Sequence, residues 1–387
     1  MLLRGTTNHE DTEKAMILFC VLIALLVVSG CFYMGRARFG RLPQGERLDR
    51  ISQSLNYRDG IFHNREPIPQ IVEGGGGFGL WLKFLLRDGE GLTPPEALPV
   101  VKTDLKTLDP NADAVVWLGH SSYFIRLGGK AILIDPVLSD HASPVSFSTR
   151  AFDGTTIYTP EDMPVIDYLL ISHDHWDHLD YDTVTALRPK IRHVVTGLGV
   201  GAHFARWEFP DEMVQEADWG EAVPAGDGLT VYVLTARHFS GRLFDRNRTL
   251  WASFALETPD RRVFYSGDSG YGSHFKEIGE RFGEFDFVMV DSGQYDAQWP
   301  YVHMMPEQAA QAAEDLRTRA AMPSHAGRFN IAFHSWDEPF RRFVAAGSGK
   351  SYRLVTPKIG EVVDLGDQSQ QFSPWWELGE KKPSAAR

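Results

Sequence analysis

The residues best suited to chemistry lie in one short stretch, which reads Ser-His-Asp-His-Trp-Asp-His-Leu-Asp over positions 172–180. It follows the apolar run 168–171, which predicts a buried strand ending at the cluster. Alternate residues of an extended chain point to one side, so His173, His175 and Asp177 could converge, with His178 beside them. Neutral imidazoles and carboxylates are zinc ligands, so the stretch predicts a metal site. A polar loop facing water would explain one histidine, but not the whole His-x-His-x-Asp-His string.

One strand end supplies too few ligands for two metal shells, so other parts of the chain must contribute. His238, Asp268 and His334 each stand out near the end of an apolar run. Each also has an ordinary interpretation, as a loop histidine, a turn aspartate and a histidine at a helix entry. Their spacing alone does not select them as ligands.

Composition places the chain among globular proteins and narrows its chemistry. At 387 residues, with 43% hydrophobic and 23% charged residues, it predicts one large domain with extensions. The formal net charge of −12 argues against a nucleic-acid partner. Cys20 and Cys31 both lie in the N-terminal apolar segment, so a metal site in the body must use His, Asp and Glu. Phosphate-binding loop and dinucleotide fingerprints are absent from the sequence, which argues against nucleotide cofactors.

The N-terminal part predicts attachment to a membrane. A polar lead, residues 1–14, precedes residues 15–35, which carry no charge and are long enough to span a bilayer. Positions 28–31, Val-Ser-Gly-Cys, resemble the cleavage box of bacterial lipoprotein signals. We therefore expect a membrane segment or signal, and a location in the bacterial envelope as a lipoprotein or single-pass anchor. A buried core helix is the alternative, and the flanking arginines and lysine do not define an orientation.

The rest of the chain divides by its patterning. Residues 36–110 are rich in turn formers and predict an extension that wraps the later domain, with an apolar run at 78–86 that packs on it or touches lipid. Residues 111–366 alternate short β-like runs with a few helical patterns, at 306–316 and around 338–344, which predicts an α/β sandwich. Residues 367–387 are expected to be a C-terminal tail, polar and disordered from position 381.

A family resemblance connects these separate motifs. The histidine cluster resembles the metal motif of the metallo-β-lactamase superfamily. Further motifs lie at residues 117–122, 134–137, 236–238, 245–251, 267–271 and 334–339. In combination they resemble the branch of N-acylphosphatidylethanolamine-hydrolysing phospholipase D, over roughly residues 39 to 364. The resemblance implies an αββα sandwich with metals at one edge.

The same resemblance implies a role for each matching residue. It implies two zinc ions, the first held by His173, His175 and His238, the second by Asp177, His178 and His334, with Asp268 bridging both. Asp177 or Asp268 would then be catalytic, by orienting a metal-bound water and accepting its proton. Five further residues, for which a structural role is equally expected, would contact the ligands from behind or line the pocket: His120, Asp135, Trp176, His303 and His325. The chain departs from the family pattern at Ser269 and at residues 325–329. The second departure lies near the expected substrate pocket, so it affects which substrate is expected.

Together with this resemblance, the residues imply a zinc-dependent hydrolase, specifically a phosphodiesterase that cleaves N-acylphosphatidylethanolamine-type glycerophospholipids with metal-activated water. The expected partners are a phospholipid or small-molecule substrate and a membrane. A lactone or small-ester hydrolase is an alternative, and so is a non-catalytic envelope protein that retains the fold. A nuclease is disfavoured by the acidic charge. Ser121 and Ser122 beside His120 do not make a serine hydrolase without a third partner.

Overall fold

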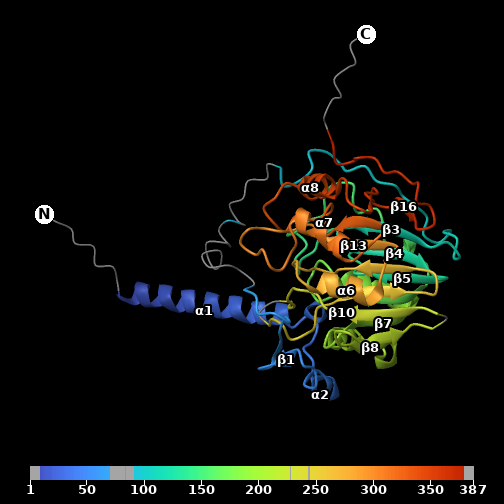
Figure 1. The fold of residues 1–387 in the computed structure, drawn as a ribbon. Helices are drawn as coiled ribbons and strands as arrows, with labels where there is room; N and C mark the ends of the chain where they lie inside the picture. The colour runs from blue at the N-terminus through green and yellow to red at the C-terminus, as the bar shows by residue number, and fades with distance from the viewer. Residues whose placement is uncertain (1–8, 70–82, 84–90, 227, 243–244, 379–387) are drawn as a thin grey trace, which may run out of the picture.

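The computed structural model describes residues 9–69, 83, 91–226, 228–242 and 245–378. Over these residues the chain forms two seven-stranded sheets that pack face to face, and a separate two-stranded hairpin. Helices cover both outer faces, which gives four layers in the order helix, sheet, sheet, helix (Figure 1). The predicted α/β sandwich is confirmed.

The first sheet has the strand order β16-β3-β4-β5-β6-β7-β8. Its strands are β3 (Ala114–Gly119), β4 (Ser122–Leu127), β5 (Lys130–Ile134), β6 (Ile166–Ile171), β7 (Ile191–Gly197), β8 (Val214–Ala217) and β16 (Val362–Asp364). Strands β3 to β5 form an antiparallel meander, whereas β5 to β8 run parallel and are joined by crossovers that contain α4 (Tyr181–Leu187) and α5 (Gly201–Arg206). The outer face packs on these helices, so β6 is covered on both sides and reads as an apolar run rather than an alternation.

The second sheet has the strand order β15-β14-β13-β12-β11-β10-β9. Its strands are β9 (Ala222–Pro224), β10 (Thr230–Leu234), β11 (Ser253–Glu257), β12 (Arg262–Tyr265), β13 (Phe287–Asp291), β14 (Ala320–Ser324) and β15 (Arg353–Leu354). Helices α6 (His274–Phe282), α7 (Pro306–Asp315) and α8 (Glu338–Gly347) pack on its outer face. The helices predicted at 306–316 and 338–344 are therefore confirmed, and Pro306 occupies the first turn of α7, where its missing N–H costs nothing.

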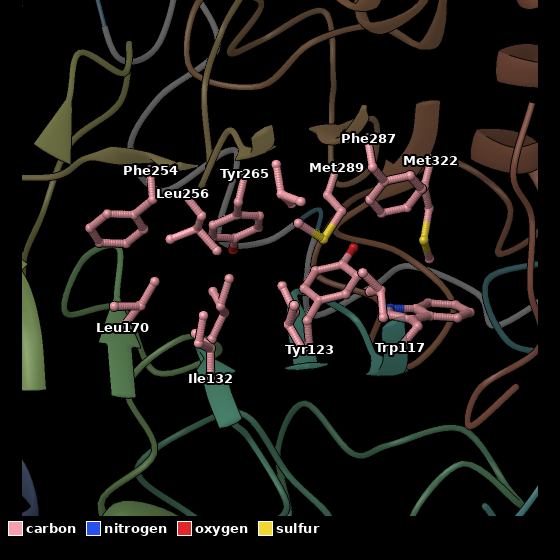
Figure 2. Packing of buried hydrophobic residues seen from close by; sticks show 14 of the residues in the cluster. Trp117, Tyr123, Ile132, Leu170, Phe254, Leu256, Tyr265, Phe287, Met289 and Met322 are labelled. Atoms are coloured by element: carbon pink, nitrogen blue, oxygen red, sulfur yellow. The ribbon is translucent and has the colours of Figure 1, made fainter. Parts of the chain in front are cut away.

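The main core lies between the two sheets. Figure 2 shows side chains from β3, β4, β5 and β6 facing those from β11 to β14, with Ile132 and Leu170 opposite Phe254 and Leu256. The larger polar-tipped side chains in this layer are satisfied, since Tyr123 donates its hydroxyl hydrogen to Ser324 Oγ at 2.7 Å. Removal of this apolar surface from water stabilises the sandwich and fixes which strand ends meet at its edge.

The N-terminal part packs partly outside this sandwich. Helix α1 (His9–Met34) is followed by the short 3₁₀ helix η1 (Ala37–Phe39), helix α2 (Glu46–Ile51) and the hairpin of β1 (Tyr57–Arg58) and β2 (Ile61–Phe62). The remaining 3₁₀ helices are η2 (Pro160–Asp162), η3 (Arg188–Lys190) and η4 (Asp211–Met213). Ile51 and Phe62 are fully buried against Leu250 and Trp251, so this part of the predicted extension is anchored to the domain. Most of the apolar run 78–86 lies outside the described residues.

The structure adds an observation at each end of the chain. In the described part of the chain, no helix meets the length and apolarity needed to cross a bilayer, so the predicted membrane segment at 15–35 is not supported. A buried core helix is wrong as well, because Met16 and Phe19 of α1 are 62% and 63% exposed. At the other end, Trp375 and Trp376 are buried against Phe340, so the packed domain continues into residues predicted as tail.

Truncation of a side chain in the core between the sheets should leave a cavity and lower the stability of the protein. Leu256→Ala should lower the free energy of unfolding by about 2–5 kcal/mol, because the Leu256 side chain is 1% exposed and its neighbours belong to two rigid sheets. Chemical denaturation followed by circular dichroism measures this change. Leu55→Ala is the control, because Leu55 is 91% exposed, and it should change stability by less than about 0.5 kcal/mol. Equal effects of the two substitutions would contradict the assigned core.

Candidate metal centre

The predicted motif lies in the loop that follows β6, at the edge where several strand ends meet. His173, His175, Asp177 and His178 occupy this loop, and Asp180 closes it by accepting a hydrogen bond from the Asp182 N–H at the start of α4. Other loops at this edge carry His120 after β3, His238 after β10, Asp268 after β12 and His325 after β14. The sheet packing thus gathers residues from five loops at one edge.

The backbone at three of these strand ends is turned in an uncommon way. His120, Asp135 and His325 have positive φ angles of 54°, 39° and 62°. Residues other than glycine rarely adopt this conformation, and it concentrates at functional sites where surrounding structure enforces it. Here it accompanies three buried polar side chains at the edge of the sandwich.

A first group of side chains brings four ligand atoms together. His173 Nε2 lies 2.8 Å from His175 Nδ1, which lies 3.2 Å from His238 Nε2. Asp268 Oδ2 lies 3.7 Å from His173 Nε2 and 3.6 Å from His238 Nε2. These four residues could hold one metal ion, and they are the set expected for the first ion.

A second group is formed by His120, Asp177, His178 and His325. Asp177 Oδ2 lies 2.9 Å from His120 Nε2 and 3.5 Å from His178 Nε2. The other oxygen of Asp268, Oδ1, lies 3.1 Å from His178 Nε2 and 3.1 Å from His325 Nδ1. Asp268 therefore presents one carboxylate oxygen to each group, which is the arrangement of a bridging ligand.

The hydrogen bonding and the pKa values of these side chains are consistent with a bound cation between them. His178 Nε2 and Asp268 Oδ1 are buried and have no hydrogen-bond partner, a costly condition that a metal ion relieves. Burial lowers the pKa of His175 to about 4 and that of His173 and His238 well below its ordinary value, which leaves neutral imidazoles able to bind metal.

The local electrostatics also favour positive charge. Burial lowers the pKa of His178, but the facing carboxylates of Asp268 and Asp177 outweigh it and hold the pKa well above its ordinary value. Burial raises the pKa of Asp268 to about 7. A donor set of imidazoles and carboxylates without thiolates suits zinc and other divalent transition metals.

Asp135 is not in either ligand group but orients the ligand residue His178 through hydrogen bonds. Its Oδ2 accepts hydrogen bonds from His178 Nδ1 at 2.8 Å and from the Tyr265 hydroxyl at 2.7 Å, and its Oδ1 accepts one from the Ser172 N–H at 2.7 Å. His178 Nδ1 therefore carries a proton, and this hydrogen bond orients the ring so that Nε2 faces the second group and could bind a metal ion. His238 is held in the same way, because its Nδ1 donates to the Val302 carbonyl at 2.9 Å.

The structure does not bring His334 into either group. Its Nε2 accepts a hydrogen bond from the Gln294 N–H at 2.9 Å, and its Nδ1 lies 2.8 Å from the Ser335 carbonyl. Its ring also stacks on Tyr295. His325 takes the expected place of His334, because His325 directly follows β14 at the edge of the sandwich, whereas His334 lies nine positions further along the chain. The sequence contained a usable signal, since the run 320–324 ends at His325 as the run 168–171 ends at the motif.

A cavity of about 300 Å³ opens over the two groups. Apolar side chains supply much of its wall, including Phe239, Trp299 and Ile331. Trp176 and His303, both predicted near the site, line it as well. His303 Nδ1 lies 2.9 Å from Asp291 Oδ2. The cavity can therefore hold an amphipathic molecule with its polar group at the metal ligands.

The sequence comparison with family models agrees with this geometry. The model described as the Beta-lactamase superfamily domain matches residues 130–326, about half of the chain. The chain belongs to the metallo-β-lactamase superfamily, and its fold and relatives define a metal-dependent hydrolase.

Individual relatives refine this assignment. N-acyl-phosphatidylethanolamine-hydrolyzing phospholipase D 1 of Caenorhabditis elegans is 31% identical, with 74% of this chain and 87% of the relative covered. An uncharacterized protein of Mycobacterium tuberculosis is 36% identical, with coverages of 84% and 88%. The solved isothiocyanate hydrolase from Delia radicum gut bacteria has a TM-score of 0.53 at 18% identity and covers 65% of this chain and 98% of its own, a likeness of fold alone.

The contacts of Asp135 predict a loss of metal affinity. Asp135→Asn should weaken metal binding about 10- to 100-fold, because an amide cannot accept from His178, Ser172 and Tyr265 as the carboxylate does. Competition with a chelating dye measures the affinity. Asp260→Asn, in an exposed turn, is the matched control and should bind as wild type does. Unchanged affinity in Asp135→Asn would remove the supporting role.

Separate alanine substitutions of His325 and His334 test which of the two histidines binds metal in the second group. His325→Ala should lose metal from the second group, because the imidazole next to Asp268 and Asp177 is gone. His334→Ala should keep the full metal content, because the His334 nitrogens are committed to the backbone. Elemental analysis of both purified variants decides the matter. Loss of metal only in His334→Ala would restore the sequence prediction.

Proposed function

We propose that this protein is a two-zinc phosphodiesterase that cleaves N-acylphosphatidylethanolamine-type glycerophospholipids. The observation that carries the proposal is the placement of Asp268, with one oxygen at each of two His/Asp groups on the floor of a partly apolar cavity. The similarity to the Caenorhabditis elegans phospholipase D supports the choice of substrate class.

In this proposal, His173, His175, His238 and Asp268 hold the first zinc ion. Asp177, His178, His325 and Asp268 hold the second, with His120 close enough to Asp177 to orient it. When bound, the metals lower the pKa of a coordinated water and stabilise charge on a phosphoryl oxygen. Asp177 and Asp268 both line the cavity, and a carboxylate oxygen of either one would accept a proton from the attacking water.

His303 is the group best placed to supply a proton. Burial lowers its pKa, but Asp291 outweighs this effect and raises the pKa above the ordinary value. Because Nδ1 faces Asp291, Nε2 is the nitrogen left to meet a substrate in the cavity. In this role His303 protonates the departing alkoxide oxygen, and the Asp291 carboxylate stabilises the charged imidazolium. The apolar wall around Phe239, Trp299 and Ile331 receives the start of an acyl chain.

A lactone or small-ester hydrolase is the second candidate. The cavity of about 300 Å³ favours it, because a small ring fits there entirely whereas a phospholipid must extend beyond it. A non-catalytic envelope protein is disfavoured, because both groups of ligand residues are complete. Attachment to a bacterial envelope membrane through residues 15–35 and the lack of a nucleic-acid partner stay predictions from the sequence.

The substrate is tested with the full-length, zinc-loaded protein in detergent micelles that contain N-acylphosphatidylethanolamine. Wild type should release phosphatidic acid and N-acylethanolamine, and Asp268→Asn should reduce the rate more than about 100-fold, beyond the loss typical of a residue that only supports a ligand. Asp260→Asn should match wild type. Full zinc occupancy with no product, together with turnover of lactones or small esters, would reject the phospholipid substrate and favour the second candidate.

A further inference from the structure

Outside the cavity, one arginine ties the metal-binding loop to the N-terminal part of the chain. Arg242 is only 5% exposed, and its Nη1 donates hydrogen bonds to the carbonyls of Asp174 at 2.9 Å and Leu179 at 2.7 Å. These two carbonyls lie near the two ends of the loop. The other terminal nitrogen, Nη2, donates to the Arg38 carbonyl in η1 at 2.9 Å. A single guanidinium therefore joins both ends of the loop to η1.

The same guanidinium also fixes the side chain in the middle of the loop. It lies 3.8 Å from the ring centroid of Trp176, within the range of a cation–π interaction. Trp176 contacts the ring of Phe39 edge to face, at 5.2 Å between centroids. Trp176 stands between His175 and Asp177, so its two contacts restrict the backbone that carries one ligand of each group.

A second connection reaches the loop through Asp174. The Arg41 N–H donates to His203 Nδ1 at 3.1 Å, so the proton of this ring is on Nε2, which donates to Asp174 Oδ2 at 3.0 Å. The chain passes very close to this ring. A Cβ atom on Gly40 would lie 1.9 Å from His203 Nδ1, and Gly40 has a φ of +76°, so only glycine fits.

Residues 33–42 are themselves held firmly on the domain. The Tyr33 hydroxyl donates to the Pro144 carbonyl at 2.6 Å, and Trp207 Nε1 donates to the Ala37 carbonyl at 2.6 Å. The described N-terminal segment thus makes contacts from the end of α1 up to the loop. It reaches the loop through Phe39, which contacts Trp176, and through the Arg38 carbonyl, which accepts a hydrogen bond from Arg242.

The charge and the hydrogen bonds of Arg242 indicate that it fixes the path of the metal-binding loop and contributes little to the stability of the fold. Burial lowers its pKa to about 10, so the side chain remains charged at neutral pH. A buried charge contributes little net stability compared with a well-packed apolar residue, because its desolvation is costly. Its three hydrogen bonds go to backbone carbonyls that define the path of the loop. Such bonds fix geometry, and metal affinity depends steeply on ligand geometry.

We propose that Arg242 is a positioning residue of the metal centre and that residues 33–42 are an integral part of that centre. Arg242 and Phe39 hold loop 173–178 in the arrangement that binds metal, and Gly40 with His203 supports it through Asp174. This proposal rests on the metal-dependent function proposed above. The N-terminal segment therefore acts on the metal ligands without touching substrate.

The test compares Arg242→Gln and Arg242→Lys with Arg248→Gln in the full-length protein. Arg248 lines the same surface cavity as Arg242 but, among the described contacts, donates no hydrogen bond to the loop. Arg242→Gln should weaken metal affinity about 10- to 100-fold and change the visible absorption spectrum of the cobalt-substituted protein. Arg242→Lys should recover part of the affinity, since it keeps the charge and one carbonyl contact. Arg248→Gln should match wild type in both measurements.

The stability of the metal-free protein separates positioning from packing. If Arg242→Gln lowers the melting temperature of the metal-free protein but leaves metal affinity and the cobalt spectrum unchanged, the proposal is overturned. Should Arg242→Gln not fold, Phe39→Leu serves instead, and it should reduce metal affinity in a folded protein. Wild type that binds no metal would defeat the metal-dependent function itself, whereas normal binding in every variant would defeat this proposal alone.

Discussion

The structure depends on the convergence of buried carboxylates and imidazoles at one edge of the sandwich. Asp268 is the clearest case, since its two oxygens face separate groups of histidines and one of them has no hydrogen-bond partner. Placing a carboxylate in such a site without a cation is costly, because burial penalises its charged form. The free energy for holding it there comes from the packed sheets on either side.

Those sheets explain why loops distant in sequence meet. Parallel strands β5, β6 and β7 end at the same edge, as do β12, β13 and β14 of the opposing sheet. The residue after each strand end is therefore close to the others, whatever the length of chain between them. Side chains behind the ligands then fix the orientation of each ring, as Asp135 does for His178 and the Val302 carbonyl for His238.

The N-terminal segment gives this arrangement a further constraint. Residues before the sandwich would ordinarily be regarded as a linker, yet η1 contacts the metal-binding loop through Phe39 and the Arg38 carbonyl. A buried arginine with backbone partners links elements that are about 200 positions apart in the chain. Tyr33 at the end of α1 contacts Phe39, and Phe39 contacts Trp176, which stands between His175 and Asp177.

The sequence by itself determined the metal motif, because His173, His175, Asp177 and His178 are local and their residue types define the chemistry. It also determined the α/β sandwich, since apolar runs of strand length predict buried strands. His238 and Asp268 were selected by family resemblance, and the structure brings both to the motif.

Only the tertiary structure decided between His325 and His334, since both are histidines near apolar residues. The outcome depends on where β14 ends and on the hydrogen bonds that His334 makes with Gln294 and Ser335. Likewise, the link from Arg242 to η1 arises because packing brings distant segments together, and no local pattern records which carbonyls an arginine will reach. Residue types determine which chemistry a local motif can perform. The long-range contacts depend on how the two sheets and the N-terminal segment pack.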